Sequence, residues 1–254
     1  MNKIKFLGTA GARFVVTRQL RKSGGIWLTL DDTNVLIDPG PGSLIRCLSS
    51  KPKLNPMDLD GIILTHRHID HSNDINLMIE AMTNGGFKKK GVVFAPKDAL
   101  EEDPVILRYV RNYVDKIEVL KEKGNYEIGN ISFSTPIKHD HGVETYGLNI
   151  YGKNNFISII TDTKYFKNLE SHYKGDILII NLVLMEKKDY IYHLSLDDAE
   201  KIISANKPKL SIISHFGMTI IKAKPWGIAE KLTQKLGVKV IAASDGMEID
   251  LDKF

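Results

Sequence analysis

The sequence predicts an α/β protein in which strands and helices form a layered sandwich rather than a regular series of β–α–β units. Short runs rich in β-branched residues recur along the whole chain, and helical patterns are fewer. The first half is strand-rich, whereas the second half pairs strands with helices. No repeat, low-complexity linker or break in composition interrupts the 254 residues, so we expect one domain over residues 1–254.

The expected strands are short apolar runs flanked by Gly, Asn and Asp, which is typical of strands and their turns. In chain order they cover residues 3–8, 25–30, 34–38, 61–65, 91–95, 131–137, 146–152, 156–161, 176–182, 209–214 and 238–243.

Three segments have the spacing of amphipathic helices, namely 70–83, 196–206 and 226–236. The second has a start signal, because Ser195 is an expected N-cap and Asp198 follows three positions later.

The composition favours a soluble, cytoplasmic protein. Its 35 basic and 31 acidic residues give a net charge of +4, which permits an anionic substrate such as a phosphate or RNA without requiring one. The single cysteine, Cys47, excludes an intrachain disulfide and a thiolate metal cluster, as expected for a reducing compartment. We expect no signal peptide, because the N-terminal segment has no long apolar stretch. No apolar run approaches the ~18 residues needed to span a membrane, so no membrane partner is expected. A homo-oligomer is compatible with these features.

The stretch "THRHIDHSND" is the strongest local signal, because it places three of the eight histidines within six positions. His66 follows an apolar strand directly, and side chains two apart in an extended segment point the same way, so His66 and His68 can converge on one ion. Asp70 and His71 come where a helix begins, and the turn directs them toward a second ion. Such nitrogen and oxygen donors suit zinc, manganese or iron, and paired ions ~3.5–4 Å apart are a known hydrolytic device.

Further residues of ligand type also follow strand-like runs. His139 and His141 come after 131–137, Asp162 after 156–161, and His215 after 209–214. Because α/β proteins build sites where strand ends meet at one edge of a sheet, these residues are candidates to complete the metal shells.

These motifs resemble the metallo-β-lactamase superfamily. "THRHIDH" matches its H-x-H-x-D-H signature, and "KIKFLGTAG", "VLIDPGPG", "HDHGVETYG", "TDT" and "IISHFG" resemble its other elements in the same order along nearly the whole chain. The resemblance implies a four-layer αβ/βα sandwich of two mixed β-sheets flanked by helices.

The resemblance also implies the ligand set for two divalent ions, with zinc expected and manganese or iron as alternatives. His66, His68 and His141 would hold one ion, Asp70, His71 and His215 the other, and Asp162 would bridge them. His141 is preferred over His139 because ribonuclease Z-like members place this ligand six residues before a glycine, here Gly147. His139 would then lie beside the site or at the surface.

Two residues have implied catalytic roles. "HLSLDDAEKI" resembles the His-Ser-Thr helix start of ribonuclease Z-like enzymes, in which this histidine, here His193, protonates the leaving oxygen. A loop histidine packed against the helix is the alternative reading. Asp70 would position the nucleophilic hydroxide while it binds metal. The carboxylates expected to orient the histidine rings are Asp38, Asp74 and Asp140, which the sequence does not rank.

The expected function is a phosphodiesterase of the ribonuclease Z-like branch, which uses a metal-bridging hydroxide as nucleophile. Its candidate substrates are a phosphodiester, another small anionic molecule, and RNA. Only 20 residues separate His141 from Asp162, and no long tRNA-binding arm of the kind many ribonucleases Z insert is visible. The alternatives are a lactone or thioester hydrolase on the same scaffold and, further off, a non-catalytic metal-binding protein. The loop between the first two strands borders the active-site cleft in this superfamily. In this chain it contains Arg13, Arg18 and Arg21, whose use as a phosphate clamp stays open.

Overall fold

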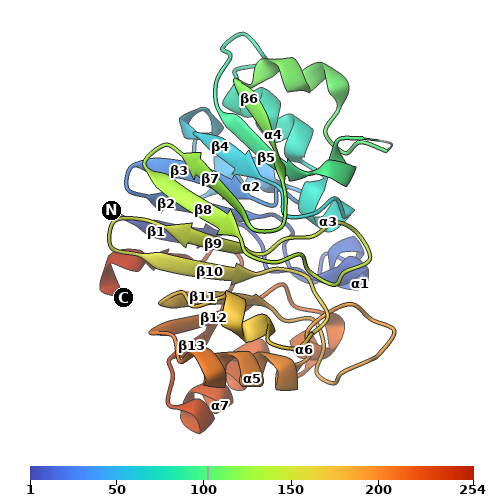
Figure 1. Cartoon of the computed structure of the whole chain (residues 1–254), viewed down its shortest axis with the longest axis vertical. Helices are drawn as coiled ribbons and strands as arrows, with labels where there is room; N and C mark the ends of the chain where they lie inside the picture. Colours follow the sequence, from blue (N-terminus) through green and yellow to red (C-terminus); the bar gives the residue numbers. More distant parts are fainter. Residues whose placement is uncertain (102) are drawn as a thin grey trace.

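Two seven-stranded β-sheets stack face to face in the computed structural model, which describes residues 1–101 and 103–254. Helices cover the outer surface of each sheet, so the layers run helix, sheet, sheet, helix (Figure 1). This arrangement confirms the predicted α/β class and the four-layer sandwich.

The first sheet combines a parallel and an antiparallel half. Its strand order is β14 (Glu248–Asp250), β1 (Lys3–Phe6), β2 (Ile26–Leu30), β3 (Thr33–Ile37), β4 (Gly61–Ile63), β5 (Val92–Pro96) and β6 (Lys116–Leu120). Strands β3 to β6 pair in parallel, and the pairs from β14 to β3 are antiparallel.

The second sheet has the same mixed character. Its strand order is β13 (Val240–Ala242), β12 (Leu210–Ser214), β11 (Ile177–Asn181), β10 (Phe156–Ile160), β9 (Leu148–Tyr151), β8 (Ile131–Thr135) and β7 (Gly124–Ile128). Strands β10 to β13 are parallel, and β7 to β10 are antiparallel.

The helices are α1 (Ala12–Thr17), α2 (Ser43–Ser49), α3 (Ile69–Ser72), α4 (Ile75–Met82), α5 (Leu196–Asn206), α6 (Met218–Lys222) and α7 (Pro225–Leu236). Short 3₁₀ segments cover Pro56–Asp58, Lys97–Ala99, Arg108–Tyr113, Leu169–His172 and Leu251–Lys253. Helices α2 and α4 bury apolar side chains against the first sheet, and α5 and α7 do so against the second.

The main core lies between the two sheets, where residues at alternate positions of each strand point inward. Phe94 and Phe133 meet there edge to face, with ring centroids 4.9 Å apart. Central strands such as β4 and β12 are buried on both faces, which explains why they read as continuous apolar runs.

Most predicted elements are confirmed, and the missed ones have weak patterns. Helix 196–206 begins at the expected cap, with Ser195 and Asp198 forming a reciprocal capping box. The expected helix 70–83 is two helices, because the chain turns between α3 and α4. Strands β6, β7 and β14 were not predicted, since the two edge strands β6 and β14 are short and half exposed, and β7 alternates buried and polar positions.

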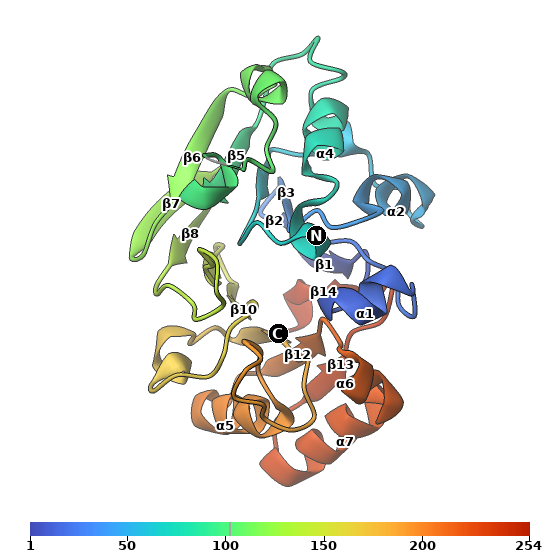
Figure 2. The same cartoon turned by 90° about the vertical axis from the view of Figure 1, so that its right-hand side faces the viewer.

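The parallel strands of both sheets end at one edge of the sandwich, where α1 and α3 also lie (Figures 1 and 2). This edge therefore gathers the residues that follow β3, β4, β10, β11 and β12.

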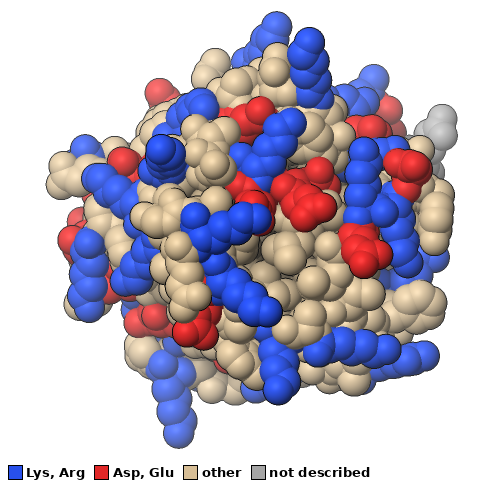
Figure 3. Space-filling model, turned by 90° about the horizontal axis from the view of Figure 1, so that it is seen from below, with Lys and Arg blue, Asp and Glu red and all other residues tan. Residues whose placement is uncertain are grey.

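No helix in residues 1–101 and 103–254 is long and apolar enough to cross a bilayer. The face that α5 and α7 cover shows lysine and arginine interspersed with acidic side chains, not a field of one sign (Figure 3).

Candidate metal centre

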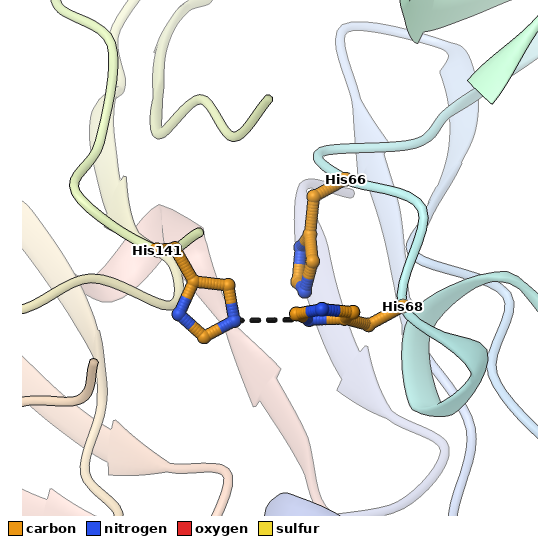
Figure 4. Close-up of side chains that lie close together, drawn as sticks. All are labelled: His66, His68 and His141. Atoms are coloured by element: carbon orange, nitrogen blue, oxygen red, sulfur yellow. Dashed lines mark hydrogen bonds between the residues drawn. The ribbon is translucent and has the colours of Figure 1, made fainter. Parts of the chain in front are cut away.

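Three histidine rings converge at the end of β4. His66 and His68 follow the strand, and His141 comes from the loop between β8 and β9 (Figure 4). His68 Nδ1 lies 3.1 Å from His141 Nε2, and one ring nitrogen from each of the three lies within 4.8 Å of the others. Two donor atoms bound tetrahedrally at ~2.1 Å from one ion are about 3.4 Å apart, so this spacing fits a shared metal.

A second cluster lies beside the first and contains a carboxylate from each sheet. His71 Nε2 and His215 Nε2 are each 3.4 Å from Asp162 Oδ2. Asp70 Oδ2 lies 3.6 Å from His215 Nε2 and 3.9 Å from His71 Nε2. This set of two imidazoles and two carboxylates also has the spacing of a coordination shell.

One oxygen of Asp162 faces both clusters. Besides its contacts in the second cluster, Oδ2 is 3.5 Å from His141 Nε2 and 3.9 Å from His66 Nε2. Burial would raise the pKa of Asp162, but nearby His215, His193 and His71 hold it well below its usual value. The carboxylate is therefore ionised and can bridge two cations.

The unpaired nitrogens fit a metal. Within the described residues, Nε2 of His66, His71 and His215 is buried with no hydrogen-bond partner. Such atoms are costly to bury unless an ion or water satisfies them. Imidazole with carboxylate is a donor set for zinc and other divalent transition metals. The residues present therefore fit divalent metal ions.

Hydrogen bonds behind the rings leave the inward nitrogens free. His71 Nδ1 donates to Asp38 Oδ2 at 2.9 Å. Thr65 Oγ1 donates to the same oxygen, so His66 Nδ1 donates to Thr65 Oγ1 at 3.1 Å. His141 Nδ1 donates to the Tyr192 carbonyl at 2.7 Å. Once Nε2 is deprotonated, each bond leaves its lone pair free for a metal, which is how carboxylates and carbonyls orient metal-binding histidines.

Of the three carboxylates expected to orient rings, the structure selects Asp38. Asp74 is buried but accepts from the Leu44 amide, and Asp140 is exposed. Burial alone would lower the pKa of His71, yet Asp38, Asp70 and Asp162 together raise it well above its ordinary value. His71 therefore tends to keep a second proton on its ring, which a metal would have to displace, so metal binding should weaken as the pH falls.

Asn181 was missed by sequence reasoning. Its Nδ2 donates to Asp162 Oδ1 at 2.8 Å, which holds the second carboxylate oxygen and turns Oδ2 toward the clusters. The available signal was its position at the end of β11, on the same edge as the ends of β10 and β12.

His139 is not a surface residue but is buried behind Asp162. Its Nδ1 lies 3.2 Å from the Asp162 carbonyl and donates to it, and its Nε2 accepts from the Tyr173 hydroxyl at 2.7 Å. Burial lowers the pKa of His139 to about 3, so the ring is neutral. Both nitrogens are used, so this histidine holds the main chain of Asp162 and has no lone pair for a metal.

His193 lies beside Asp162, in the segment before α5. Its Nδ1 is buried without a partner, 3.6 Å from Asp162 Oδ2, and its ring centroid is 4.9 Å from that of His141. Burial lowers its pKa, against an opposing effect of Asp162. The ring therefore borders the candidate metal site instead of only packing on the helix.

Tight backbone contacts support two candidate ligands. A Cβ on Gly11 would lie 2.1 Å from the His215 carbonyl oxygen, and one on Gly40 would lie 2.0 Å from that of Asp70. Asp38 and His215 adopt positive φ angles of 52° and 56°, which are uncommon for residues with a side chain and often mark functional sites.

The three arginines lie on or beside α1. Arg13 and Arg18 are exposed, and the Arg21 guanidinium lies 5.9 Å from the Phe216 ring centroid. None forms an ion pair with a carboxylate in the part of the chain that the structure describes. A phosphate-binding role for them stays a prediction.

Known proteins share this fold and these motifs. Residues 33–216 match the family described as a beta-lactamase superfamily domain. An uncharacterized protein of Methanocaldococcus jannaschii is 28% identical over 263 aligned residues, which cover 98% of this chain and 95% of that protein. Ribonuclease Z of Thermoplasma acidophilum is 27% identical over 151 residues, covering 58% of this chain and 47% of the relative. This chain thus matches about half the length of that ribonuclease.

Solved structures share the fold over almost the full chain. The metallo-β-lactamase fold protein YhfI from Bacillus subtilis has a TM-score of 0.81 at 17% identity, with 98% of both chains covered. A diphosphatase from the PhnP family has a TM-score of 0.72 at 19% identity, again with 98% of both chains covered. At such identities the likeness shows the architecture alone.

Proposed function

This chain belongs to the β-lactamase superfamily of metal-dependent hydrolases, and we propose that it is a two-metal phosphodiesterase similar to ribonuclease Z. The observation that carries the proposal is the position of Asp162 Oδ2, within 3.9 Å of ring nitrogens from both histidine clusters.

The proposed ligands divide into two shells that share one carboxylate. His66, His68 and His141 would hold one ion, Asp70, His71 and His215 the other, and Asp162 both. Bound divalent ions, zinc above all, would activate water near neutral pH and offset the charge that develops on phosphoryl oxygens.

Side chains of the protein would position the attacking water and protonate the leaving oxygen. Asn181 keeps Asp162 Oδ2 turned inward, and Asp70 can accept a hydrogen bond from the attacking water. As the water oxygen bonds to phosphorus, the water would give one proton to Asp70, the bond to the leaving oxygen would break, and His193 would give that oxygen a proton. Release of the proton from Asp70 to solvent and uptake of one by His193 would then restore both groups. The products are a phosphomonoester and an alcohol. Positioned acids of this kind contribute about 10²- to 10⁴-fold.

Two observations favour a phosphodiester over the lactone or thioester alternative. His193 borders the site beside Asp162 and, when protonated, can serve as the acid for a poor alkoxide leaving group, which lactone or thioester hydrolysis needs less. Among the described residues, no tyrosine hydroxyl forms a hydrogen bond to a proposed ligand, so no tyrosine is held against the two clusters, as the alternative would favour.

The names of two matched proteins also support phosphate chemistry, namely ribonuclease Z and the diphosphatase from the PhnP family. The short segment between His141 and Asp162 favours a small phosphodiester or single-stranded RNA over a precursor tRNA.

A substrate panel tests the proposal. Zinc-loaded protein should hydrolyse bis(p-nitrophenyl) phosphate faster than p-nitrophenyl phosphate, a homoserine lactone or an acyl thioester. Faster turnover of the lactone or thioester, with metals bound, would reject the phosphodiesterase assignment in favour of the alternative.

A further inference from the structure

The segment between β11 and α5 is attached to the metal centre by its backbone. The Tyr192 carbonyl accepts the hydrogen bond from His141 Nδ1 at 2.7 Å, and the next residue is His193. This bond fixes the position of the tyrosine beside a proposed ligand, while 45% of its surface stays exposed. The backbone of Tyr192 is therefore fixed beside the site, and its ring is half exposed.

A lysine lies under this ring. Lys164 comes two residues after Asp162, and its amide donates to the Asp140 carbonyl at 2.8 Å. Its ammonium lies 5.8 Å from the Tyr192 ring centroid and donates to the Asp189 carbonyl at 2.8 Å. The cation thus contacts the aromatic ring and ties down the segment that carries it.

The lysines of this region form no ion pair among the residues that the structure describes. Lys187 and Lys188 lie on the same segment as Tyr192. Neither they nor Lys164 forms an ion pair with any carboxylate in residues 1–101 and 103–254. An aromatic ring next to a lysine that has no carboxylate partner matches the chemistry of a nucleotide, which has a flat base and an anionic phosphate.

Space for a ligand lies near these two residues. A groove of about 630 Å³ is lined by the loop 138–144 together with Arg67 and Asp98. Tyr192 and Lys164 do not line it, but the Tyr192 carbonyl is hydrogen-bonded to the ring of His141, and the Lys164 amide to the carbonyl of Asp140, both of which do. The lining mixes charges, with Arg67 and Lys138 beside Asp98, Asp140 and Glu144, so an anionic group would be attracted from the lysine side of the groove.

We propose that Tyr192 and Lys164 form a nucleobase-stacking subsite at the entrance to the metal centre. A base would stack on the exposed phenol ring, while Lys164 and its neighbours attract the phosphate of the same nucleotide. Stacking tolerates any base, so this subsite selects nucleotides as a class without reading their sequence. The inference rests on the proposed phosphodiesterase function and narrows its substrates to nucleotide diesters.

Two phosphodiesters that differ by a nucleoside test this assignment. The ratio of kcat/KM for the p-nitrophenyl ester of thymidine 5′-monophosphate to that for methyl p-nitrophenyl phosphate should exceed one in the wild type. In Tyr192→Leu this ratio should fall about tenfold, the usual size of one base–aromatic contact, mainly through KM of the thymidine ester. Tyr192→Phe should restore it, since stacking needs the ring and not the hydroxyl. Tyr190→Leu removes a 77% exposed tyrosine of the same segment and should leave the ratio unchanged.

A binding measurement separates this inference from the proposed function. Equilibrium dialysis of thymidine 5′-monophosphate against zinc-loaded protein should give a Kd about tenfold higher for Tyr192→Leu than for the wild type, even if neither ester is hydrolysed. Equal Kd values and equal ratios in the two proteins would overturn the subsite. An effect of Tyr190→Leu as large as that of Tyr192→Leu would overturn the choice of residue. Hydrolysis of neither ester, with the difference in Kd intact, would reject the phosphodiesterase function alone.

Discussion

Gly11 lies against His215 so closely that a single added methyl group should damage the metal centre. A Cβ at this position would be 2.1 Å from the His215 carbonyl oxygen and 2.7 Å from its ring Cδ2. Real Cβ contacts essentially never fall below 3.0 Å, so the two backbones must separate by at least 0.9 Å. The Gly11 amide also donates to the Phe216 carbonyl, and Phe216 donates to Thr9, so the displacement is transmitted directly to the loop that carries His215.

The expected loss follows from that displacement. A misplacement of about 1 Å at a reacting centre costs on the order of 10²-fold in rate, or roughly 2.7 kcal/mol. Gly11→Ala should therefore lower kcat/KM for bis(p-nitrophenyl) phosphate by about that factor and reduce the zinc bound per chain, measured by inductively coupled plasma mass spectrometry.

Gly227→Ala is the matched control for this substitution. A Cβ at Gly227, in α7, meets no atom within 4 Å, so the variant should keep its activity and gain about 0.5–1 kcal/mol of stability. Full zinc content and wild-type kcat/KM in Gly11→Ala would refute the argument that close packing on His215 holds the site.

Four further predictions concern the groups around the ions. His193→Ala should lower kcat about 10²- to 10⁴-fold with zinc content unchanged, and should abolish the fall in kcat as pH rises, because a general acid is lost when it deprotonates; equal pH profiles would reject the role. Asn181→Leu should weaken metal binding about 10- to 100-fold, as measured by competition with a chelator, since Asp162 Oδ1 loses its donor. His139→Asn should lower the free energy of unfolding at pH 7, measured in urea, by about 1–3 kcal/mol, because buried hydrogen-bond partners are left unpaired. The pKa of His139 is about 3 in the folded protein and ~6.5 in the unfolded chain, so this group should cost the wild type up to ~1.4 kcal/mol of stability per pH unit as the pH falls from ~6.5. The variant should lose less stability over this range, and His172→Asn, the control, should behave like the wild type. Chelation should lower the Tm by about 5–10 °C for each ion, as expected when an ion present at ~100 times its Kd is removed, and no change in Tm would mean that no metal stabilises the fold.

The central parts of the fold were predictable because the strands that carry the site are buried on both faces. Strands such as β4 and β12 must be apolar throughout, and a polar residue directly after them stands out as a possible ligand. The seven proposed ligands could therefore be named from their positions after strands together with the superfamily motifs. The edge strands β6 and β14 lack this constraint, and their sequences carry no comparable pattern.

Contacts between distant segments could not be predicted in the same way. Asn181, the bond from His141 to the Tyr192 carbonyl, and the contact between Gly11 and His215 depend on how loops meet at the sheet edge. His139 shows the limit most clearly, because a histidine two residues from a proposed ligand resembles a ligand or a surface residue in sequence. Its burial against Tyr173 and the Asp162 backbone follows only from tertiary packing.

The central claim is that one carboxylate joins two metal shells into a hydrolytic site. The most direct test is to titrate metal-free protein with zinc while following both bound metal and the hydrolysis of bis(p-nitrophenyl) phosphate. We predict that activity rises until two zinc ions are bound per chain, and that Asp162→Ala loses both the activity and at least one ion. Maximal activity with one ion bound, or two ions retained by Asp162→Ala, would contradict the bridged two-metal site.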